Sequence, residues 1–346
     1  MTKKAVIGIL AGLAGLSLAC LCNPTGTIPL VLTPTTILPT PVPSPVPSAS
    51  IEPTSSVGIA PTCEKSLARV LHESETTFPS GQKLETDFTL VTYSVSGDTL
   101  TDPVYVNPIP PKLESYQQDT AGQQKLWHFV TNIIPSDQRT QITRFVIFTD
   151  GVSNSLGAVE QTDNPHDWML EMDIEDAANF PDLSTTLIHE FGHLLSLNDS
   201  QVPTDYQVFN NPDDQKIYDQ EAATCPTYFM FEGCSRSDSY INQFFQHFWP
   251  KIYPEWQTID AETDQDTLDQ KLDSFYQEYT DQFVSSYAVT SPEEDFAESF
   301  MYFVFTPRPY DAGIAEQKIL FFYDYPEMVI LRGRILAKLC TYVEKP

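Results

Sequence analysis

The chain has 346 residues, and its 47 acidic side chains against 19 basic ones give a formal net charge of −28. This charge argues against nucleic acid and anionic membrane surfaces as binding partners, because both are themselves negatively charged. Aromatic residues make up 12% of the sequence, which is enough to build a sizeable core. The composition therefore indicates an acidic globular protein and excludes a nucleic-acid-binding one.

The first 20 residues have the organisation of an export signal. Two lysines precede an uncharged run over residues 5–19, which stops at Cys20. The run is too short for an ordinary transmembrane helix and fits the apolar part of a signal peptide. Residues 16–20 resemble a bacterial lipobox, in which Cys20 carries lipid after cleavage, and an ordinary secretory signal is the alternative. Residues 1–20 thus predict an extracytoplasmic protein, held at the cell surface by an N-terminal lipid anchor in the membrane.

Residues 21–62 are rich in Pro, Thr and Ser, and Glu52 is the one charged residue among them. Such a segment cannot bury a core and favours extended conformations, so we expect a disordered tether. Residues 63–346 remain, and their length fits a single α+β domain with insertions.

Four cysteines fall in this domain, and four cysteines allow three disulfide pairings. We favour a bond from Cys225 to Cys234, which closes a short loop, and one from Cys63 to Cys340, which joins the ends of the domain. A structural zinc site built from these cysteines is the alternative. That alternative lacks the CxxC spacing typical of such sites.

The first part of the domain is expected to form a small sheet. Alternating and β-branched runs predict four strands, with one helical segment between the first and the second. The strands are expected over residues 87–95, 143–149, 156–161 and 168–174, and the helix over residues 123–134.

A second helix is predicted from Pro181 to about Asn198. Pro, Asp and Ser open it, and apolar residues recur on one of its faces. The helix contains the sequence HEFGH over residues 189–193. The strands therefore lead directly into a buried helix that carries this motif.

His189 and His193 are four residues apart, so they share a helix face and can bind one metal ion. Glu190 then stands beside a metal-bound water and can take its proton as a general base. The flanking residues are apolar, and buried histidines in such surroundings would lack partners without a metal ion. We interpret the two histidines as ligands of Zn²⁺ and Glu190 as a catalytic residue.

A catalytic zinc ion needs a third protein ligand and leaves its fourth position to water. Asp199 is one candidate, because it lies six residues after His193, where metzincins carry their third ligand. The glycine at which the metzincin chain turns back is replaced here by Ser196. The other candidate is a carboxylate further along the chain.

Residues 200–280 are acidic and aromatic, with helices expected over 240–249 and 267–279, and we assign no chemistry to them. Ser291 then opens another helix, with a proline and carboxylates in the first turn, where the helix dipole favours them. Two further helical segments follow, as far as Cys340.

In the helix that begins near Ser291, Glu294 and Glu298 are one turn apart and face the same way. Glu293 replaces Glu294 as the candidate ligand if the register is shifted by one residue.

HEFGH, followed downstream by Tyr287 and by the pattern Glu-x-x-Ala-Glu-x-Phe over residues 294–300, resembles the catalytic domain of anthrax lethal factor and related gluzincin metallopeptidases. The resemblance covers these two short segments. It implies that Glu294 is the third zinc ligand and that Glu298 supports the metal-binding histidines. It implies further that the Tyr287 hydroxyl stabilises the developing oxyanion. The implied fold is zincin-like: a small mixed sheet packed on the HExxH helix, then a mainly helical part.

The sequence thus predicts a lipid-anchored, extracytoplasmic zinc metalloendopeptidase that hydrolyses protein or peptide substrates. An edge strand near residues 157–162 is expected to bind the peptide backbone by β-addition. The alternative is a non-catalytic surface module for adhesion or partner binding, in which the zinc site is structural.

Overall fold

The computed structural model describes residues 61–76, 83–151, 155–310 and 313–343. The predicted signal peptide, Cys20 and the tether up to residue 60 lie outside the described residues. Residues 61 and 62, assigned to the tether, instead open the first helix, α1 (Pro61–Thr76). Within the described ranges, no helix combines the length and the apolar character that crossing a membrane requires.

The first half of the domain contains a mixed five-stranded sheet with the strand order β2-β1-β3-β5-β4. Its strands are β1 (Lys83–Ser96), β2 (Thr99–Tyr105), β3 (Ile142–Gly151), β4 (Gly157–Gln161) and β5 (Trp168–Asp173). β3 and β5 pair in parallel, and the other neighbouring strands pair antiparallel. The four predicted strands are confirmed, and β4 is an edge strand.

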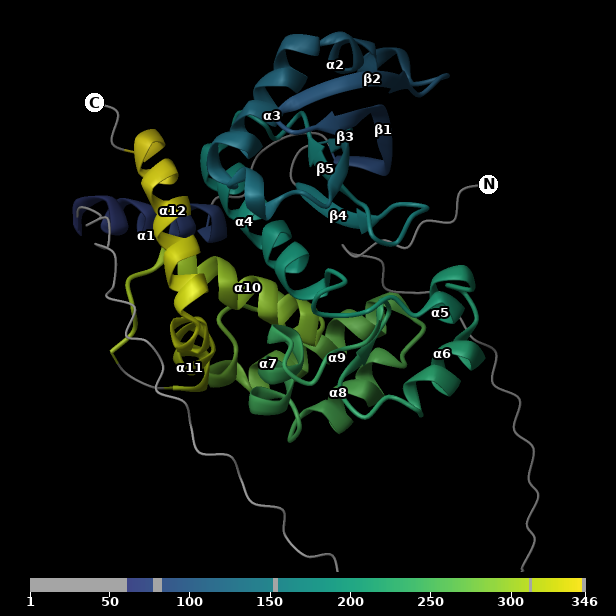
Figure 1. Cartoon of the computed structure of the whole chain (residues 1–346), viewed down its shortest axis with the longest axis vertical. Helices are drawn as coiled ribbons and strands as arrows, with labels where there is room; N and C mark the ends of the chain where they lie inside the picture. Colours follow the sequence, from purple (N-terminus) through teal and green to yellow (C-terminus); the bar gives the residue numbers. More distant parts are fainter. Residues whose placement is uncertain (1–60, 77–82, 152–154, 311–312, 344–346) are drawn as a thin grey trace, which may run out of the picture.

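Helices pack on this sheet from the segments that flank it. α2 (Glu114–Gln118) and α3 (Thr120–Ile133) lie between β2 and β3 in the chain, and α4 (Phe180–Leu197) follows β5. Figure 1 shows α4 beneath the sheet, with β4 on one side and α10 on the other. α4 is therefore the element that connects the sheet to the helical half of the protein.

The second half is mainly helical, as predicted. Its helices are α5 (Tyr206–Asn210), α6 (Gln215–Ala222), α7 (Tyr240–Phe248), α8 (Tyr253–Asp260), α9 (Gln265–Glu278), α10 (Pro292–Phe305), α11 (Ile314–Phe321) and α12 (Pro326–Val343). Single 3-10 turns are η1 (Pro111–Leu113), η2 (Ser136–Gln138), η3 (Thr280–Gln282), η4 (Tyr287–Val289) and η5 (Phe322–Asp324). A small hairpin, β6 (Phe229–Met230) and β7 (Gly233–Cys234), interrupts the helices. The α+β class is confirmed.

α4 and α10 pack against each other through nearly continuous buried faces. The side chain of Ser291 caps α10 by accepting the backbone N–H of Glu294 at 3.1 Å. The rings of Phe191 and Phe300 meet at 6.1 Å between the helices. This apolar packing surrounds the polar residues of the motif.

Both favoured disulfides are confirmed. Cys63 pairs with Cys340 and joins α1 to α12, and Cys225 pairs with Cys234 and closes the β6–β7 hairpin. The cysteine-based zinc site is therefore wrong, because these sulfur atoms are bonded to one another.

Candidate metal centre

The residues of the HEFGH motif lie on the buried face of α4. His193 is 1% exposed, Glu190 is 5% exposed, and His189 is similarly buried. Because the two histidines are one turn apart, both imidazoles point from α4 towards the first turns of α10. Burying three such polar groups together is unfavourable unless they find partners.

Three ligand atoms meet where α4 and α10 face each other. Glu294 Oε2 lies 2.9 Å from His189 Nε2 and 3.3 Å from His193 Nε2, and the two Nε2 atoms are 3.1 Å apart. Bonds of about 2.0–2.1 Å in a tetrahedral zinc site place ligand atoms about 3.3 Å from one another. The triangle therefore has the size that one metal ion requires. Among the described residues, this is the group of His, Cys, Asp and Glu side chains that can hold a metal ion.

The second nitrogen of His189 is also held in place. His189 Nδ1 lies 2.8 Å from Glu298 Oε1, and the other oxygen of Glu298 accepts the Ser285 hydroxyl at 2.5 Å. Ser285 Oγ in turn accepts the Ala288 backbone N–H at 3.2 Å. Such a chain fixes the ring so that Nε2 is free for a metal ion. The sequence predicted Glu298 but not Ser285, which belongs to no motif.

The charges of the three ligands depend on one another. Burial alone would lower the pKa of His189, but hydrogen bonds and negative charge from Glu294 and Glu298 outweigh it and raise the pKa well above its usual value. Burial would raise the pKa of Glu294, yet the neighbouring imidazoles of His193 and His189 lower it. Positive charge is therefore favoured at the point where the three side chains meet, as binding of a cation requires.

Glu190 lies between this group and the sheet. Burial raises the pKa of its carboxyl, while the two imidazoles and the Val159 backbone N–H of β4 oppose that shift. Its Oε2 atom is buried and makes no hydrogen bond within the described part of the chain. A carboxylate with a raised pKa and an uncommitted oxygen beside a metal site has the properties of a general base.

Tyr287 belongs to η4, just before α10, and its ring centroid lies 5.7 Å from that of His189. Burial raises the pKa of its phenol well above the usual value, and the charges of Glu294 and Glu190 add to the shift. The hydroxyl thus remains protonated and can donate a hydrogen bond. The structure brings Tyr287 to the metal group, as the resemblance implied.

Two candidate ligands lie elsewhere. α4 ends at Leu197, so Asp199 leaves the helix and instead contacts His166 and accepts the Thr204 hydroxyl at 3.1 Å. The chain does not turn back at Ser196, whose hydroxyl remains inside the helix and donates to the Gly192 carbonyl at 3.0 Å. Asp199 is therefore not part of the metal group.

Glu293, the neighbour of Glu294, accepts the Tyr228 hydroxyl at 2.8 Å and is likewise not part of the metal group. Tyr228 precedes β6, so the disulfide-closed hairpin contacts the first turn of α10. Glu232, in the turn of the same hairpin, is buried, and the His193 imidazole opposes the rise that burial causes in the pKa of its carboxyl. The close spacing of Cys225 and Cys234 predicted a closed loop. Nothing in the sequence indicated that this loop would pack against α10.

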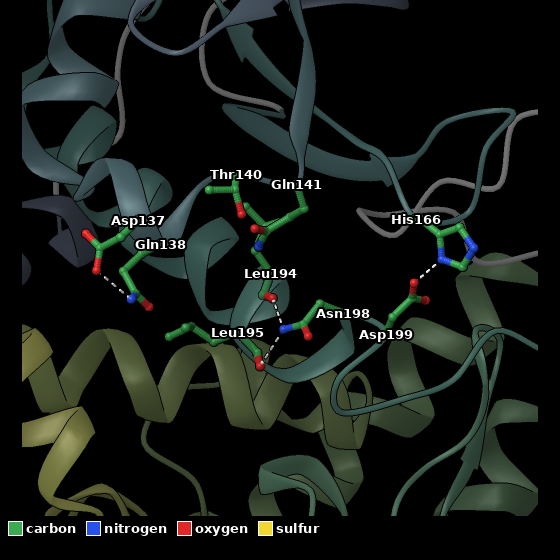
Figure 2. A pocket seen from close by; sticks show the side chains of 9 residues that line it. All are labelled: Asp137, Gln138, Thr140, Gln141, His166, Leu194, Leu195, Asn198 and Asp199. Carbon is green, nitrogen blue, oxygen red and sulfur yellow. Dashed lines mark hydrogen bonds and ion pairs between the residues drawn. The ribbon is translucent and has the colours of Figure 1, made fainter.

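A pocket of about 280 Å³ opens at the C-terminal end of α4 (Figure 2). His166 and Asp199 stand at one end of the view and Asp137 at the other, with Leu194 and Asn198 of the α4 end between them. None of the three candidate ligands lines this pocket. The candidate metal group therefore lies away from this pocket, between α4 and α10.

Comparison of the chain with protein-family models, curated proteins and solved structures gave no match. The function of the protein is therefore inferred from the contacts described above.

Proposed function

We propose that the protein is an extracytoplasmic zinc metalloendopeptidase, attached to the membrane by lipid on Cys20, with a zincin-like domain related to the gluzincin peptidases. One observation carries this proposal: His189, His193 and Glu294 converge within hydrogen-bond distance, with the Glu190 carboxylate buried beside them. A purely structural metal site requires no such carboxylate.

The three convergent side chains would hold the ion through two Nε2 atoms and one carboxylate oxygen. When bound there, Zn²⁺ supplies a Lewis acid that makes a water molecule nucleophilic near neutral pH. Glu190 takes the proton from this water at its carboxylate and passes it to the leaving amine. The Tyr287 hydroxyl donates a hydrogen bond to the oxyanion that forms at the attacked carbonyl.

The edge strand β4 supports a peptide as the substrate. It lies at the border of the sheet, packs on α4, and carries the Val159 N–H that faces Glu190. An extended peptide that pairs with this edge would run past the general base. Pairing by backbone hydrogen bonds would hold the peptide in register across the metal group.

The test is to measure the zinc content of the purified protein and of Glu190→Gln, and to assay both against a peptide library. We expect one zinc ion per chain in each protein and cleavage by the wild type alone, because the substitution removes the base but no ligand. Equal cleavage by Glu190→Gln would refute the peptidase proposal. One zinc ion per chain without cleavage by either protein would favour the non-catalytic surface module.

A further inference from the structure

The β6–β7 hairpin contacts the first turn of α10 and the segment that follows α4. At its base the Tyr228 hydroxyl donates to Glu293, in the first turn of α10. At its tip the Glu232 carbonyl accepts the Asp205 backbone N–H at 2.8 Å, in the segment that follows α4. The Cys225–Cys234 disulfide closes the hairpin.

The tip has little room to move. Gly233 has a φ of +145°, and a Cβ added there would lie 2.6 Å from the Pro203 carbonyl oxygen. Only glycine adopts this backbone conformation readily and allows so close an approach. Glu232 immediately precedes Gly233, so its backbone is held in place by the contacts of the tip with Pro203 and Asp205.

Two buried polar atoms, one on α4 and one at this tip, have no hydrogen-bond partner within the described residues. One is Nδ1 of His193, and the other is Oε1 of Glu232. Both residues are almost fully enclosed, with Glu232 only 2% exposed. A ring nitrogen that can donate and a carboxylate oxygen that can accept are complementary, and burial makes an unpaired atom of either kind costly.

The two groups are also within electrostatic reach. Burial raises the pKa of the Glu232 carboxyl to about 7, the charge of Glu293 adds to that rise, and the His193 imidazole opposes it. His193 thus differs from His189 in one respect: the Nδ1 of His189 already has its carboxylate, Glu298, at 2.8 Å.

We propose that Glu232 is a positioning residue of the metal centre, whose carboxylate accepts a hydrogen bond from the Nδ1–H of His193 through one bridging water. The bond holds the ring with Nε2 towards Glu294 and His189 and makes that nitrogen a stronger ligand. The inference rests on the metal site of the proposed function. It assigns a role to the insertion between the two motifs: the insertion brings the second supporting carboxylate.

The test measures zinc affinity by competition with a chromogenic chelator. Loss of a carboxylate that supports a metal-binding histidine weakens metal binding by about 10- to 100-fold. We expect Glu232→Met, which has no acceptor, to show a loss of this size. Glu232→Gln, which keeps an oxygen but no charge, should give an intermediate value. Glu298→Gln should also bind zinc more weakly, whereas Glu278→Gln, at an exposed position of α9, should match the wild type.

Urea unfolding of the metal-free proteins separates positioning from a contribution to the fold. Glu232 Oε1 makes no direct hydrogen bond within the described residues, so replacing this buried side chain should leave the metal-free protein at least as stable as the wild type. Zinc affinities of Glu232→Met and wild type within threefold of each other would overturn the proposal. So would a metal-free Glu232→Met protein that fails to fold. If the wild type itself binds no zinc, the proposed metal site fails first, and this inference with it.

Discussion

Gly192 of α4 and Ala297 of α10 face each other so closely that a Cβ added at Gly192 would lie 3.0 Å from the Cα of Ala297. Each of them lies between metal-site residues of its own helix, Gly192 just before His193 and Ala297 just before Glu298. Two small side chains at this point let the helices approach. Their approach is what allows Glu294 to reach both imidazoles.

Gly192→Ala should therefore separate α4 from α10 and weaken the site. We expect the free energy of unfolding to fall by about 1–3 kcal/mol through overpacking, together with a loss of zinc affinity. Gly333→Ala is the matched control, because Gly333 is also inside a helix and a Cβ there would contact nothing within 4 Å. The free energy of unfolding of this control should rise by about 0.5–1 kcal/mol. Equal stabilisation of both variants in urea unfolding would contradict the close-approach argument.

The identity of the third ligand can be decided by zinc content. Glu294→Gln should lose most of its bound zinc, because it removes the charged oxygen of the triangle. Glu293→Gln changes the adjacent residue, which bonds Tyr228, and should keep its zinc. Asp199→Asn should also keep it. Metal loss in either of the last two variants, with retention in Glu294→Gln, would reassign the ligand.

Tyr287→Phe should separate chemistry from metal binding. The phenol lies beside His189 but is not one of the three ligand atoms, so zinc content and fold should be unchanged. Removing one oxyanion donor typically lowers kcat by about 100- to 1000-fold, and we expect a fall in that range with little change in KM. The result that would count against this role is unchanged peptide cleavage by a fully zinc-loaded variant.

The stability of the metal-free protein should depend on pH through Asp173. Burial raises the pKa of this carboxyl to about 7, although the backbone N–H groups of Asp150 and Glu175 oppose the shift. The folded pKa exceeds the usual aspartate value of 3.8, so between these two pH values the folded state binds a proton that the unfolded state has lost. The contribution of Asp173 to stability is therefore present at low pH and is lost as the pH rises towards 7.

In Asp173→Asn the free energy of unfolding should fall less steeply with rising pH. The slope should differ from that of the wild type by at most about 1.4 kcal/mol per pH unit. The measurement is urea unfolding across the acidic to neutral range with a metal chelator present. Asp266→Asn, at an exposed position in the first turn of α9, controls for the loss of one charge. An Asp173→Asn slope equal to that of the wild type would show that this carboxyl does not titrate as described.

The two disulfides should differ in their effects. Cys63 and Cys340 are 277 residues apart in sequence, and Cys225 and Cys234 are nine apart. Loop-closure entropy then predicts losses of roughly 5–6 and 2–3 kcal/mol on removal. Replacing the first pair by alanine should chiefly lower stability, while replacing the second should chiefly lower zinc affinity, because it releases the hairpin that holds Glu232. The opposite pattern in unfolding and chelator-competition experiments would contradict these assignments.

The sequence was informative where structure is local. His189 and His193 share a face because helical spacing is regular, and Glu294 and Glu298 do so for the same reason. Buried strands such as β3 were recognisable in the sequence as runs of apolar and β-branched residues. β2 was not predicted, because Leu100 is its one buried residue and the alternation is therefore weak. The short helices α5, α6 and α8 have too few turns to show a period.

The contacts that complete the site are not local and could not be predicted. Glu232 lies in a two-residue turn and Ser285 in a loop, and neither has a pattern that relates it to a histidine far away in the chain. Their roles depend on how the chain between α4 and α10 folds back onto both helices. Glu298 was predicted only because its helix resembles a known one.

The Cys63–Cys340 bond also decides how the domain would carry mechanical load. Tension on the chain ahead of Pro61 enters the fold at α1, and the disulfide passes it covalently to α12, which α1 crosses in Figure 1. α4 and α10 are not on this covalent path, so force would reach them only through non-covalent packing contacts. We expect that a domain pulled through α1 keeps the spacing of its metal-binding side chains.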